Sequence, residues 1–264
     1  MTLITLGPEG TFSHDLALKM DRNICLVSSI GRIFQEVIKT GITGLVPLEN
    51  SEAGGVVATM DGLMEYPVYI NSETYLKISH SIASDCKLED ISVIFSHPQS
   101  HEQCSRFIDN LGILVIHTES NAASAIAQKD RPGSAAIISK GLAHQYNIPL
   151  IRDHIENNPE NTTRFITISK DQVVSVNPEK CSLIIDPGEN RAGLLYDLLS
   201  PFKNTGVNLT RIESRPSKRS MGSYVFFIDL ECDGAWSDAV HQLKLISQVK
   251  NLGCYNTIGV LPWR

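Results

Sequence analysis

Two hydroxyl side chains stand beside a permanent cation where a polar loop enters a β-branched strand. The residues are Thr162, Thr163, Arg164 and Phe165, and the strand continues as Ile-Thr-Ile-Ser. A positioned hydroxyl next to an arginine can bind a small carboxylated substrate and assist proton movement. A strand that merely opens with β-branched side chains has the same composition. This segment alone therefore leaves a catalytic and a structural interpretation open.

A second polar segment, residues 7–13, directly follows an expected strand. It reads Gly-Pro-Glu-Gly-Thr-Phe-Ser and leads into an expected helix. Glycines let a backbone approach a ligand closely, and a helix start offers free N–H groups to an anion, so Thr11 is a candidate binding residue. A tight turn with Ser13 as the N-cap explains the same segment without a ligand.

A third segment contains Glu49, Asn50 and Ser51. It follows a strand expected over residues 44–47 and precedes two glycines and a helix expected over residues 56–64. Asn50 offers donors and an acceptor, and Ser51 offers a hydroxyl. Asparagine and serine are also common turn and capping residues, which is the alternative. Glu49 would repel an anionic ligand, so we expect it to orient other groups.

A fourth polar segment begins at Ser96 and reads Ser-His-Pro-Gln-Ser-His-Glu-Gln. Ser96 and Gln103 could line a binding cleft, although Ser100 with Gln103 also fits a helix-capping box. His97 and His101 are spaced like half of a metal site. No third ligand stands at a suggestive spacing, so we expect no metal.

Each of the four segments lies at an end of an expected strand. Ligands of open α/β sheets bind at the carboxyl ends of strands, so one shared cleft would explain all four segments, whereas independent caps explain each alone. The sequence contains no Ser-His-Asp, Cys-His or phosphate-loop pattern. The chemistry indicated is acid-assisted and electrostatic, without a cofactor.

The elements that must position these residues alternate over the first two thirds of the chain. Apolar runs predict strands, and 3.6-residue spacing predicts helices. The strands are expected over residues 2–6, 25–28, 44–47, 92–95, 114–117 and 134–138, and the helices over residues 13–20, 30–39, 56–64, 99–110 and 121–128. This alternation predicts mainly parallel sheets covered by helices. A linker is expected near residues 175–180.

Residues 181–264 predict a compact second unit. Strands are expected over residues 181–185, 207–214, 224–230 and 254–261, and helices over residues 194–202 and 236–249. This order is βαββαβ, a ferredoxin-like arrangement. Alternate residues of the strand over 207–214 are polar, which is compatible with one face that is solvated or paired with another subunit. The alternative is that the loop at Asn208 receives a small amino acid at a helix start.

Composition and charge exclude several classes of protein. Apolar residues make up 42% of the 264 residues, which suffices for a sizeable core. A net charge of −6 argues against nucleic acid or an anionic membrane as the main partner. The first apolar run is too short for a signal peptide and no stretch is long enough to span a membrane, so we expect a cytoplasmic protein. The six scattered cysteines predict buried reduced thiols rather than disulfides or a zinc site.

In order and spacing, these motifs resemble those of the prephenate dehydratases over nearly the whole chain. The matching positions are residues 7–13, Glu49, Asn50, Ser51, Ser96, His97, Pro98, Gln99, Gln103, Cys104, Thr162, Thr163, Arg164, Phe165, Glu213, Ser214, Arg215 and Pro216. The resemblance implies a two-lobed α/β catalytic domain like the type II periplasmic binding proteins over residues 1–175, with lobe 1 at about 1–75 and 158–175 and lobe 2 at about 76–157. It also implies an ACT regulatory domain over residues 181–264. Because Met1 lies just before the first expected strand, we expect no chorismate mutase segment ahead of it.

The family's reaction removes carbon dioxide and the ring hydroxyl from prephenate, which gives phenylpyruvate for L-phenylalanine biosynthesis. The resemblance implies that Thr163 lies nearest the departing hydroxyl and relays or orients a proton. Asn50, Ser96 and Gln103 would line the cleft as further catalytic residues. Arg164 would clamp or neutralise the side-chain carboxylate of the substrate. The other substrate-binding residues implied are Thr11, Glu49, Ser51, Thr162 and Phe165.

The ACT resemblance implies that L-phenylalanine binds between paired ACT domains of a homodimer or homotetramer and inhibits by feedback. Where the family has Pro-Gly-Ala-Leu, residues 192–195 of this chain read Ala-Gly-Leu-Leu. A Leu194 side chain that faces the effector pocket would alter phenylalanine binding, and one that faces the core would change little. The residues implied at this site are Gly193, Leu194, Leu195, Asn208, Leu209, Glu213, Ser214 and Arg215.

Two other functions are compatible with the sequence. Arogenate dehydratases use the same scaffold on a substrate that has an amino group in place of the keto oxygen. A lobed α/β fold can also serve a protein that only captures an amino acid or an organic anion. Turnover of prephenate would separate an enzyme from such a binding protein.

Overall fold

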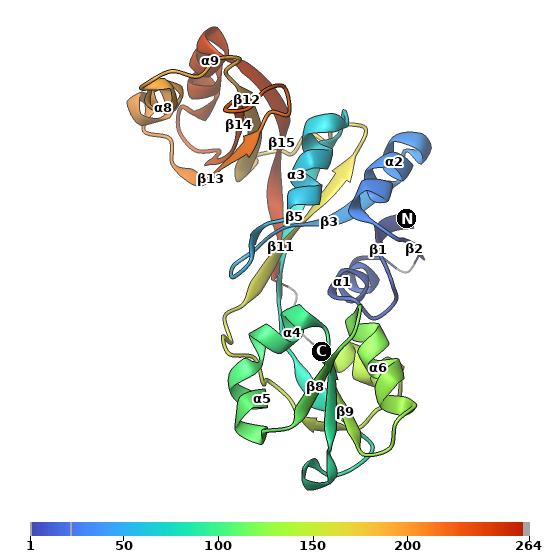
Figure 1. Cartoon of the computed structure of the whole chain (residues 1–264). Helices are drawn as coiled ribbons and strands as arrows, with labels where there is room; N and C mark the ends of the chain where they lie inside the picture. The colour runs from blue at the N-terminus through green and yellow to red at the C-terminus, as the bar shows by residue number, and fades with distance from the viewer. Residues whose placement is uncertain (1, 22, 261–264) are drawn as a thin grey trace.

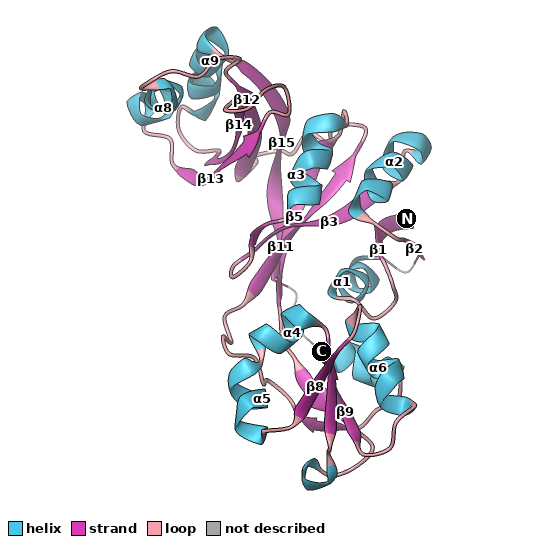
Figure 2. Ribbon diagram, in the orientation of Figure 1, coloured by secondary structure: helices cyan, strands magenta, loops and turns pink. Residues whose placement is uncertain are grey.

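Three regions of regular structure stack end to end along an elongated molecule (Figure 1). The computed structural model describes residues 2–21 and 23–260. Within these ranges a ten-stranded sheet runs through the upper and middle regions, and a five-stranded sheet forms the lower region (Figure 2). No helix in the described ranges is both long and apolar enough to cross a bilayer.

Lobe 1 is the middle region, in which helices cover part of the larger sheet. Its elements are β1 (Thr2–Leu6), α1 (Phe12–Met20), β2 (Asn23–Val27), α2 (Ile30–Thr40), β3 (Thr43–Asn50), β4 (Gly54–Gly55), α3 (Val57–Glu65), β5 (Tyr69–Lys77) and β11 (Thr162–Ser169). β1 pairs in parallel with β2 and β3, whereas β11 pairs antiparallel with β3 and β5. The apolar spacing of α2 buries Ile33, Phe34 and Val37 in the main core.

Lobe 2 is the lower region, built on the smaller sheet. Its elements are β6 (Ser81–Ala83), the 3₁₀ helix η1 (Leu88–Asp90), β7 (Val93–Ser96), α4 (Pro98–Gln103), α5 (Ser105–Leu111), β8 (Leu114–His117), α6 (Asn121–Lys129), β9 (Ser134–Ile138), α7 (Lys140–Gln145) and β10 (Leu150–Arg152). β7 pairs in parallel with β8 and β9, and β6 pairs antiparallel with β9 and β10. Helices α5 to α7 pack apolar residues against this sheet in two clusters.

The chain crosses between the lobes twice. Residues 78–80 lead from β5 into β6, and residues 153–161 lead from β10 into β11. The two crossings are hydrogen-bonded to each other: Ile78 N donates to Asn161 O at 2.8 Å, and Ile155 N donates to His80 O at 3.1 Å. Two short paired connections of this kind form the hinge about which lobes can close.

The C-terminal unit has the βαββαβ order expected from the sequence. Its elements are β12 (Lys180–Asp186), α8 (Leu194–Thr205), β13 (Leu209–Pro216), β14 (Tyr224–Glu231), α9 (Trp236–Ile246) and β15 (Gln248–Val260). Helices α8 and α9 cover one face of its strands (Figure 2). On the other face Ile184, Val225 and Phe227 join the core of lobe 1. The expected two-lobed α/β architecture with a ferredoxin-like unit is confirmed.

The long strand β15 joins the C-terminal unit to lobe 1 (Figure 1). It pairs antiparallel with β12 and then in parallel with β5, so both regions share one sheet. Gly253, the Cα partner of Ser182 in the pairing with β12, has φ +123°, and a Cβ there would lie 2.4 Å from Ile70 O. Only glycine allows the strand to pass so close to β5 in this conformation.

Several expected boundaries were wrong. The helix expected over residues 99–110 is broken at Cys104 into α4 and α5. The helix expected over residues 236–249 ends at Ile246, and the final strand begins at Gln248 instead of Cys254. Its expected last residue, Leu261, lies outside the described residues. The larger sheet is mixed rather than mainly parallel, because β11 returns through the hinge and inserts antiparallel between β3 and β5.

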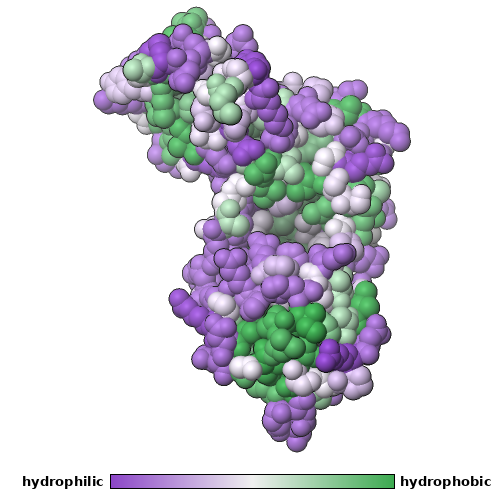
Figure 3. Space-filling model, viewed as in Figure 1, coloured by the Kyte–Doolittle hydropathy of each residue, from purple (hydrophilic) through white to green (hydrophobic). Residues whose placement is uncertain are grey.

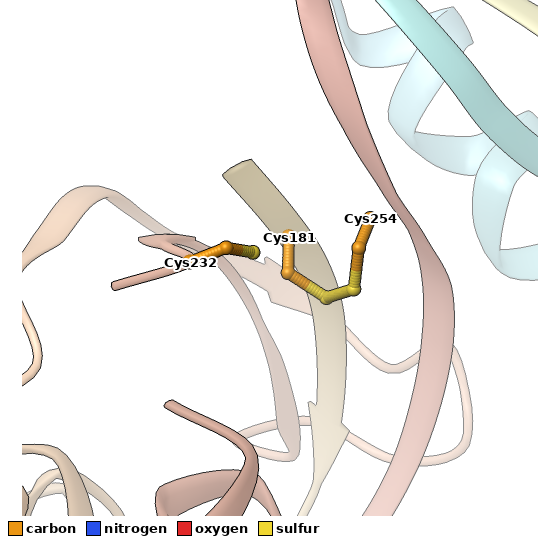
Figure 4. A group of neighbouring side chains, drawn as sticks. All are labelled: Cys181, Cys232 and Cys254. Carbon is orange, nitrogen blue, oxygen red and sulfur yellow. A yellow bond between two sulfur atoms is a disulfide. The ribbon is translucent and has the colours of Figure 1, made fainter. Parts of the chain in front are cut away.

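The expectation of reduced thiols was wrong for two cysteines. Cys181 and Cys254 are Cα partners on β12 and β15 and form a disulfide, while Cys232 lies close by as a thiol (Figure 4). The three sulfur atoms lie within 4.8 Å of one another. Burial and the charge of Asp233 raise the pKa of the Cys232 thiol to about 11. Because disulfide sulfurs do not supply thiolates, these three cysteines offer no trithiolate site for a metal in this state.

Candidate active site

Asn50 and Thr163 face each other across neighbouring strands. They are Cα partners in the antiparallel pairing of β3 with β11. Asn50 Nδ2 donates to Thr163 Oγ1 at 2.9 Å and to Asn161 Oδ1 at 2.7 Å. Because Thr163 Oγ1 accepts this bond, its own O–H points elsewhere and can donate to a bound group. The pair therefore presents an oriented hydroxyl donor.

The loop after β3 is held by the same asparagine and by Ser51. Asn50 Oδ1 accepts from the backbone N–H groups of Glu52 and Ala53 at 3.0 and 2.9 Å. Ser51 N donates to Thr162 O at 2.9 Å, and Thr162 N donates to Ser51 Oγ at 3.0 Å. Ser51 and Thr162 therefore fasten the loop to β11, which fixes the site.

A cavity of about 310 Å³ lies between this loop and helix α4 of lobe 2. Its lining residues are Glu52, Ala53, Gln99, Glu102, Gln103 and Asn157. The molecular surface is hollowed between the two lobes (Figure 3). The Asn50 and Thr163 pair stands at the base of the loop that forms one wall, and Gln103 belongs to the opposite wall. The structure thus brings the segment that contains Asn50, the segment that contains Gln103 and the hinge together at one cleft.

His80 is a site residue that the sequence analysis missed. Its ring is 1% exposed, and its Nε2 lies 2.9 Å from Gln103 Oε1. The ring makes an edge contact with Phe12 of lobe 1, with centroids 5.6 Å apart. Glu156 Oε2 accepts from the His80 backbone N–H at 2.9 Å. His80 therefore orients Gln103 from within the hinge.

Burial of His80 gives the protein a pH-dependent stability. Burial lowers the pKa of this ring below 6.5, and the hydrogen bond to Gln103 and the charges of Glu156 and Glu52 oppose the shift only in part. The folded protein then binds fewer protons at His80 than the unfolded chain does. The contribution of the neutral, buried His80 ring to the free energy of unfolding is therefore complete above the unfolded pKa of about 6.5 and is lost as the pH falls.

We expect the free energy of unfolding to fall less steeply in His80→Gln than in the wild type between about pH 6.5 and pH 5. Urea denaturation at a series of pH values measures this slope. The exposed His144→Gln serves as the matched control. Equal slopes for His80→Gln and the wild type would contradict the assignment.

The segment over residues 7–13 forms a contact between the lobes. Thr11 is the N-cap of α1 and accepts from His14 N at 3.3 Å, so the expectation that Ser13 would be the N-cap was wrong: Ser13 lies inside the first turn of the helix. Gly10 has φ +79°, and a Cβ there would lie 1.8 Å from Leu142 Cδ1 of α7. Glu9 accepts from Gln145 Nε2 at 3.2 Å. Thr11 therefore caps α1, while Glu9 and Gly10 contact α7 of lobe 2.

Two further expected site residues are buried away from the cavity. Ser96 is fully buried, and its Oγ donates to His97 O at 3.1 Å. Phe165 is 2% exposed and lies in an apolar cluster with Leu45 and Leu76. Like Asn50 and Thr163, neither side chain is among the residues that line the cavity, and the expected roles of Ser96 and Phe165 stay predictions.

Arg164 does not face the cavity, contrary to the expectation of a substrate clamp. It follows Thr163 in β11, and successive side chains of a strand point to opposite faces of the sheet. Its side chain is 3% exposed, with Nη1 2.5 Å from Asp229 Oδ2 and Nη2 2.9 Å from Tyr255 Oη. Both partners belong to the C-terminal unit. A guanidinium engaged in this way offers no free pair of donors to a substrate carboxylate, so the clamp does not fit the structure.

Two carboxylates of lobe 1 complete the surroundings of Arg164. Glu49 Oε1 accepts from Nη1 at 2.9 Å, and Glu73 Oε2 lies 2.7 Å from Nε. Burial disfavours the charged guanidinium of Arg164 and by itself would lower its pKa. The electrostatic effects of Asp229, Tyr255 and Glu73 outweigh burial, so the pKa of Arg164 is raised. Arg164 therefore stays protonated and ties lobe 1 to the C-terminal unit.

The residues expected at an effector site divide between the two faces of the C-terminal unit. Leu194 is 8% exposed and lies in the core under α8 and α9, so its bulk faces the core. Glu213 and Arg215 instead face lobe 1, where Arg215 Nη2 lies 3.5 Å from Asp61 Oδ1. Leu209 packs partly against the same core as Leu194. The other four expected residues belong neither to this core nor to the contact with lobe 1, and they are exposed: Gly193, Leu195, Asn208 and Ser214.

The two parts of the chain match two family models. Residues 3–173 match the model described as prephenate dehydratase. Residues 188–234 match the model described as ACT domain. The first match covers lobes 1 and 2, and the second lies in the C-terminal unit.

Relatives and a solved structure are similar over most of this chain. A bifunctional chorismate mutase/prephenate dehydratase of Pseudomonas aeruginosa is 38% identical over 232 residues, which are 85% of this chain and 63% of that protein. The chain thus spans less than two thirds of the length of that relative. A prephenate dehydratase of Methanocaldococcus jannaschii is 35% identical over 235 residues, 85% of this chain and 86% of that protein. The structure of a prephenate dehydratase in complex with L-Phe from Arthrobacter aurescens has a TM-score of 0.87 at 28% identity, and covers 97% of this chain and 90% of its own.

Proposed function

The chain belongs to the prephenate dehydratase family, and from this premise we propose that it converts prephenate to phenylpyruvate, carbon dioxide and water. The observation that carries the proposal is the Thr163 hydroxyl. Asn50 orients it at the base of the loop that lines the cavity between the lobes. The cavity volume of about 310 Å³ lies at the lower end of the range for small-molecule sites, about 300–1,000 Å³.

The reaction moves one electron pair through the ring of prephenate. The bond to the ring carboxylate breaks, its electrons complete the aromatic ring, and the hydroxyl leaves from the opposite carbon. Hydroxide leaves poorly, so it needs a hydrogen bond or a proton to depart as water. Thr163 donates its O–H to the departing oxygen while Asn50 Nδ2 holds Thr163 Oγ1 from the other side. Because threonine is a very weak acid, Thr163 orients and relays the proton rather than supplying it alone.

The polarity of the cavity supports loss of the ring carboxylate. A cation paired with that carboxylate would stabilise the ground state and oppose its departure as neutral carbon dioxide. Among the described residues, the lining of the cavity contains amides and acids but no lysine or arginine. The amides of Gln99, Gln103 and Asn157 can donate hydrogen bonds to the substrate. The carboxylates of Glu52 and Glu102 disfavour additional negative charge in the cavity and so favour loss of the ring carboxylate as neutral carbon dioxide.

Regulation and assembly complete the proposal. The Arthrobacter aurescens relative was solved in complex with L-Phe, and we assign L-phenylalanine as an effector of the ACT domain here. Support comes from the open space beside Gly193 at the start of α8 and from Leu194, which faces the core and leaves that space clear. The edge strand β13, with Ile212 47% exposed, supports pairing of ACT domains in a homodimer or homotetramer. A cytoplasmic location belongs to the same proposal.

The first test is ultraviolet detection of phenylpyruvate formed from prephenate by purified, metal-free protein, with and without L-phenylalanine. We expect product without phenylalanine and less product with it. Equal amounts of product with and without phenylalanine would contradict the effector assignment and leave the assignment as an enzyme intact.

Arogenate is the matched second substrate for this test. Faster turnover of arogenate than of prephenate would assign the chain as an arogenate dehydratase. No product from either substrate would overturn the catalytic proposal and favour a protein that only binds an organic anion.

A further inference from the structure

The carboxylate of Glu49 is shared by two arginines from different parts of the chain. Its Oε1 accepts from Nη1 of Arg164 at 2.9 Å, and its Oε2 accepts from Nε of Arg211 at 2.8 Å. Arg164 lies in β11 of lobe 1, and Arg211 lies in β13 of the ACT domain. The two arginine side chains are 3% and 8% exposed, and the Glu49 side chain between them is 32% exposed. Glu49 is therefore fixed from two sides.

Glu49 directly precedes the asparagine that orients the catalytic hydroxyl. In the pairing of β3 with β11, Glu49 lies opposite Arg164 and Asn50 lies opposite Thr163. Adjacent pairs of a sheet point to opposite faces, so the carboxylate faces the ACT domain while the amide faces the cleft. The peptide unit that joins Glu49 to Asn50 is planar and stiff. One rigid peptide unit therefore separates the residue held by the two arginines from the residue that orients Thr163.

Glu213 of the same ACT strand secures the other end of the loop. A Cβ added at Gly55 would lie 2.4 Å from Glu213 Oε2 and 2.7 Å from Oε1, so this carboxylate packs directly on the Gly55 backbone. Arg211 Nη2 also donates to Glu213 Oε2. Strand β13 thus contacts the loop over residues 49–55 at both ends. Asn50 and the backbone N–H groups that bind its Oδ1 lie between these two contacts.

We propose that Arg211 is a positioning residue for Asn50 and Thr163, acting through Glu49, so that the place of strand β13 sets the geometry of the catalytic hydroxyl. This inference rests on the proposed function, because it assigns regulation to the same site. A ligand that displaces β13 changes the bond between Asn50 and Thr163 without touching the substrate. The effector and the substrate are then coupled through one carboxylate.

The kinetic test replaces the guanidinium and keeps the apolar stem. We expect Arg211→Met to lower kcat for phenylpyruvate formation by about tenfold with KM changed less than about twofold, because misplaced catalytic groups slow the chemical step more than they weaken binding. Lys218→Met is the matched control, since Lys218 Nζ binds Asp61 Oδ2 at 2.8 Å across the same interface and touches neither Glu49 nor Asn50. We expect its kcat to equal that of the wild type.

A double-mutant cycle tests whether Arg211 acts through Glu49. We expect Arg211→Met combined with Glu49→Gln to be no slower than the slower single variant, because both changes interrupt one connection. Multiplicative losses would overturn the route through Glu49. A raised KM with unchanged kcat for Arg211→Met would overturn the positioning role. If Arg211→Met does not fold, Arg211→Lys, which keeps the charge but lacks the planar set of donors, is expected to lower kcat in the same direction.

Hydrogen exchange separates this inference from the proposed function. The Glu52 and Ala53 amides donate to Asn50 Oδ1, so Arg211→Met is expected to speed their exchange and Lys218→Met is not. If the wild type turns over prephenate, unchanged kcat in Arg211→Met overturns the inference. If the wild type is inactive, the proposed function fails and exchange alone decides: faster exchange supports the connection, and unchanged exchange overturns it.

Discussion

Thr163→Val is expected to lower kcat for phenylpyruvate formation by about 10²- to 10⁴-fold, the usual contribution of a positioned proton donor. Valine keeps the β-branched shape of threonine, so the strand β11 and its pairing with β3 are preserved. The only group removed is the hydroxyl whose oxygen accepts from Asn50 Nδ2 at 2.9 Å. Steady-state ultraviolet assays would show a low kcat with KM changed less than about threefold, because the lost interaction is made mainly in the transition state.

Thr163→Ser is the matched control, since it keeps the hydroxyl and removes the γ-methyl group. We expect it to retain kcat within about tenfold of the wild type, because the Asn50 amide can orient the serine oxygen in the same way. Equal activity of Thr163→Val and the wild type would remove Thr163 from the mechanism. Equal losses in both variants would point to packing of the methyl group instead of the hydroxyl.

The elements that hold the site were predictable because their signals are local. The strands expected over residues 2–6, 114–117 and 134–138 coincide with β1, β8 and β9, each of which is a short and mainly apolar run. Helices α1 and α2 begin within one residue of their expected starts, where Thr11 and Ser29 serve as N-caps. Such patterns depend only on neighbours in the sequence.

The partners of the site residues were not predictable because they are distant in the chain. Arg164 is separated from Asp229 by 65 residues and from Tyr255 by 91, and only the return of β15 beside β5 brings them together. One part of this result was available from the sequence, since Thr163 and Arg164 are neighbours in a strand and cannot face the same cleft. His80 carried no such signal, because its role depends on Gln103, which lies 23 residues away in lobe 2.

Arg164→Met is expected to lower the free energy of unfolding by about 3–5 kcal/mol, the usual cost of removing one partner from a buried ion pair. The change leaves Asp229, which is 2% exposed, with the hydroxyl of Ser182 but without its cation. Urea denaturation followed by circular dichroism measures the loss. The matched control is Arg191→Met, which removes an arginine whose ion pairs are exposed and should change the free energy little.

A free energy of unfolding within about 1 kcal/mol of the wild-type value would contradict this prediction, because that is the usual contribution of an exposed ion pair. Such a result would mean that packing of the arginine stem, more than the charge of Arg164, joins lobe 1 to the ACT domain.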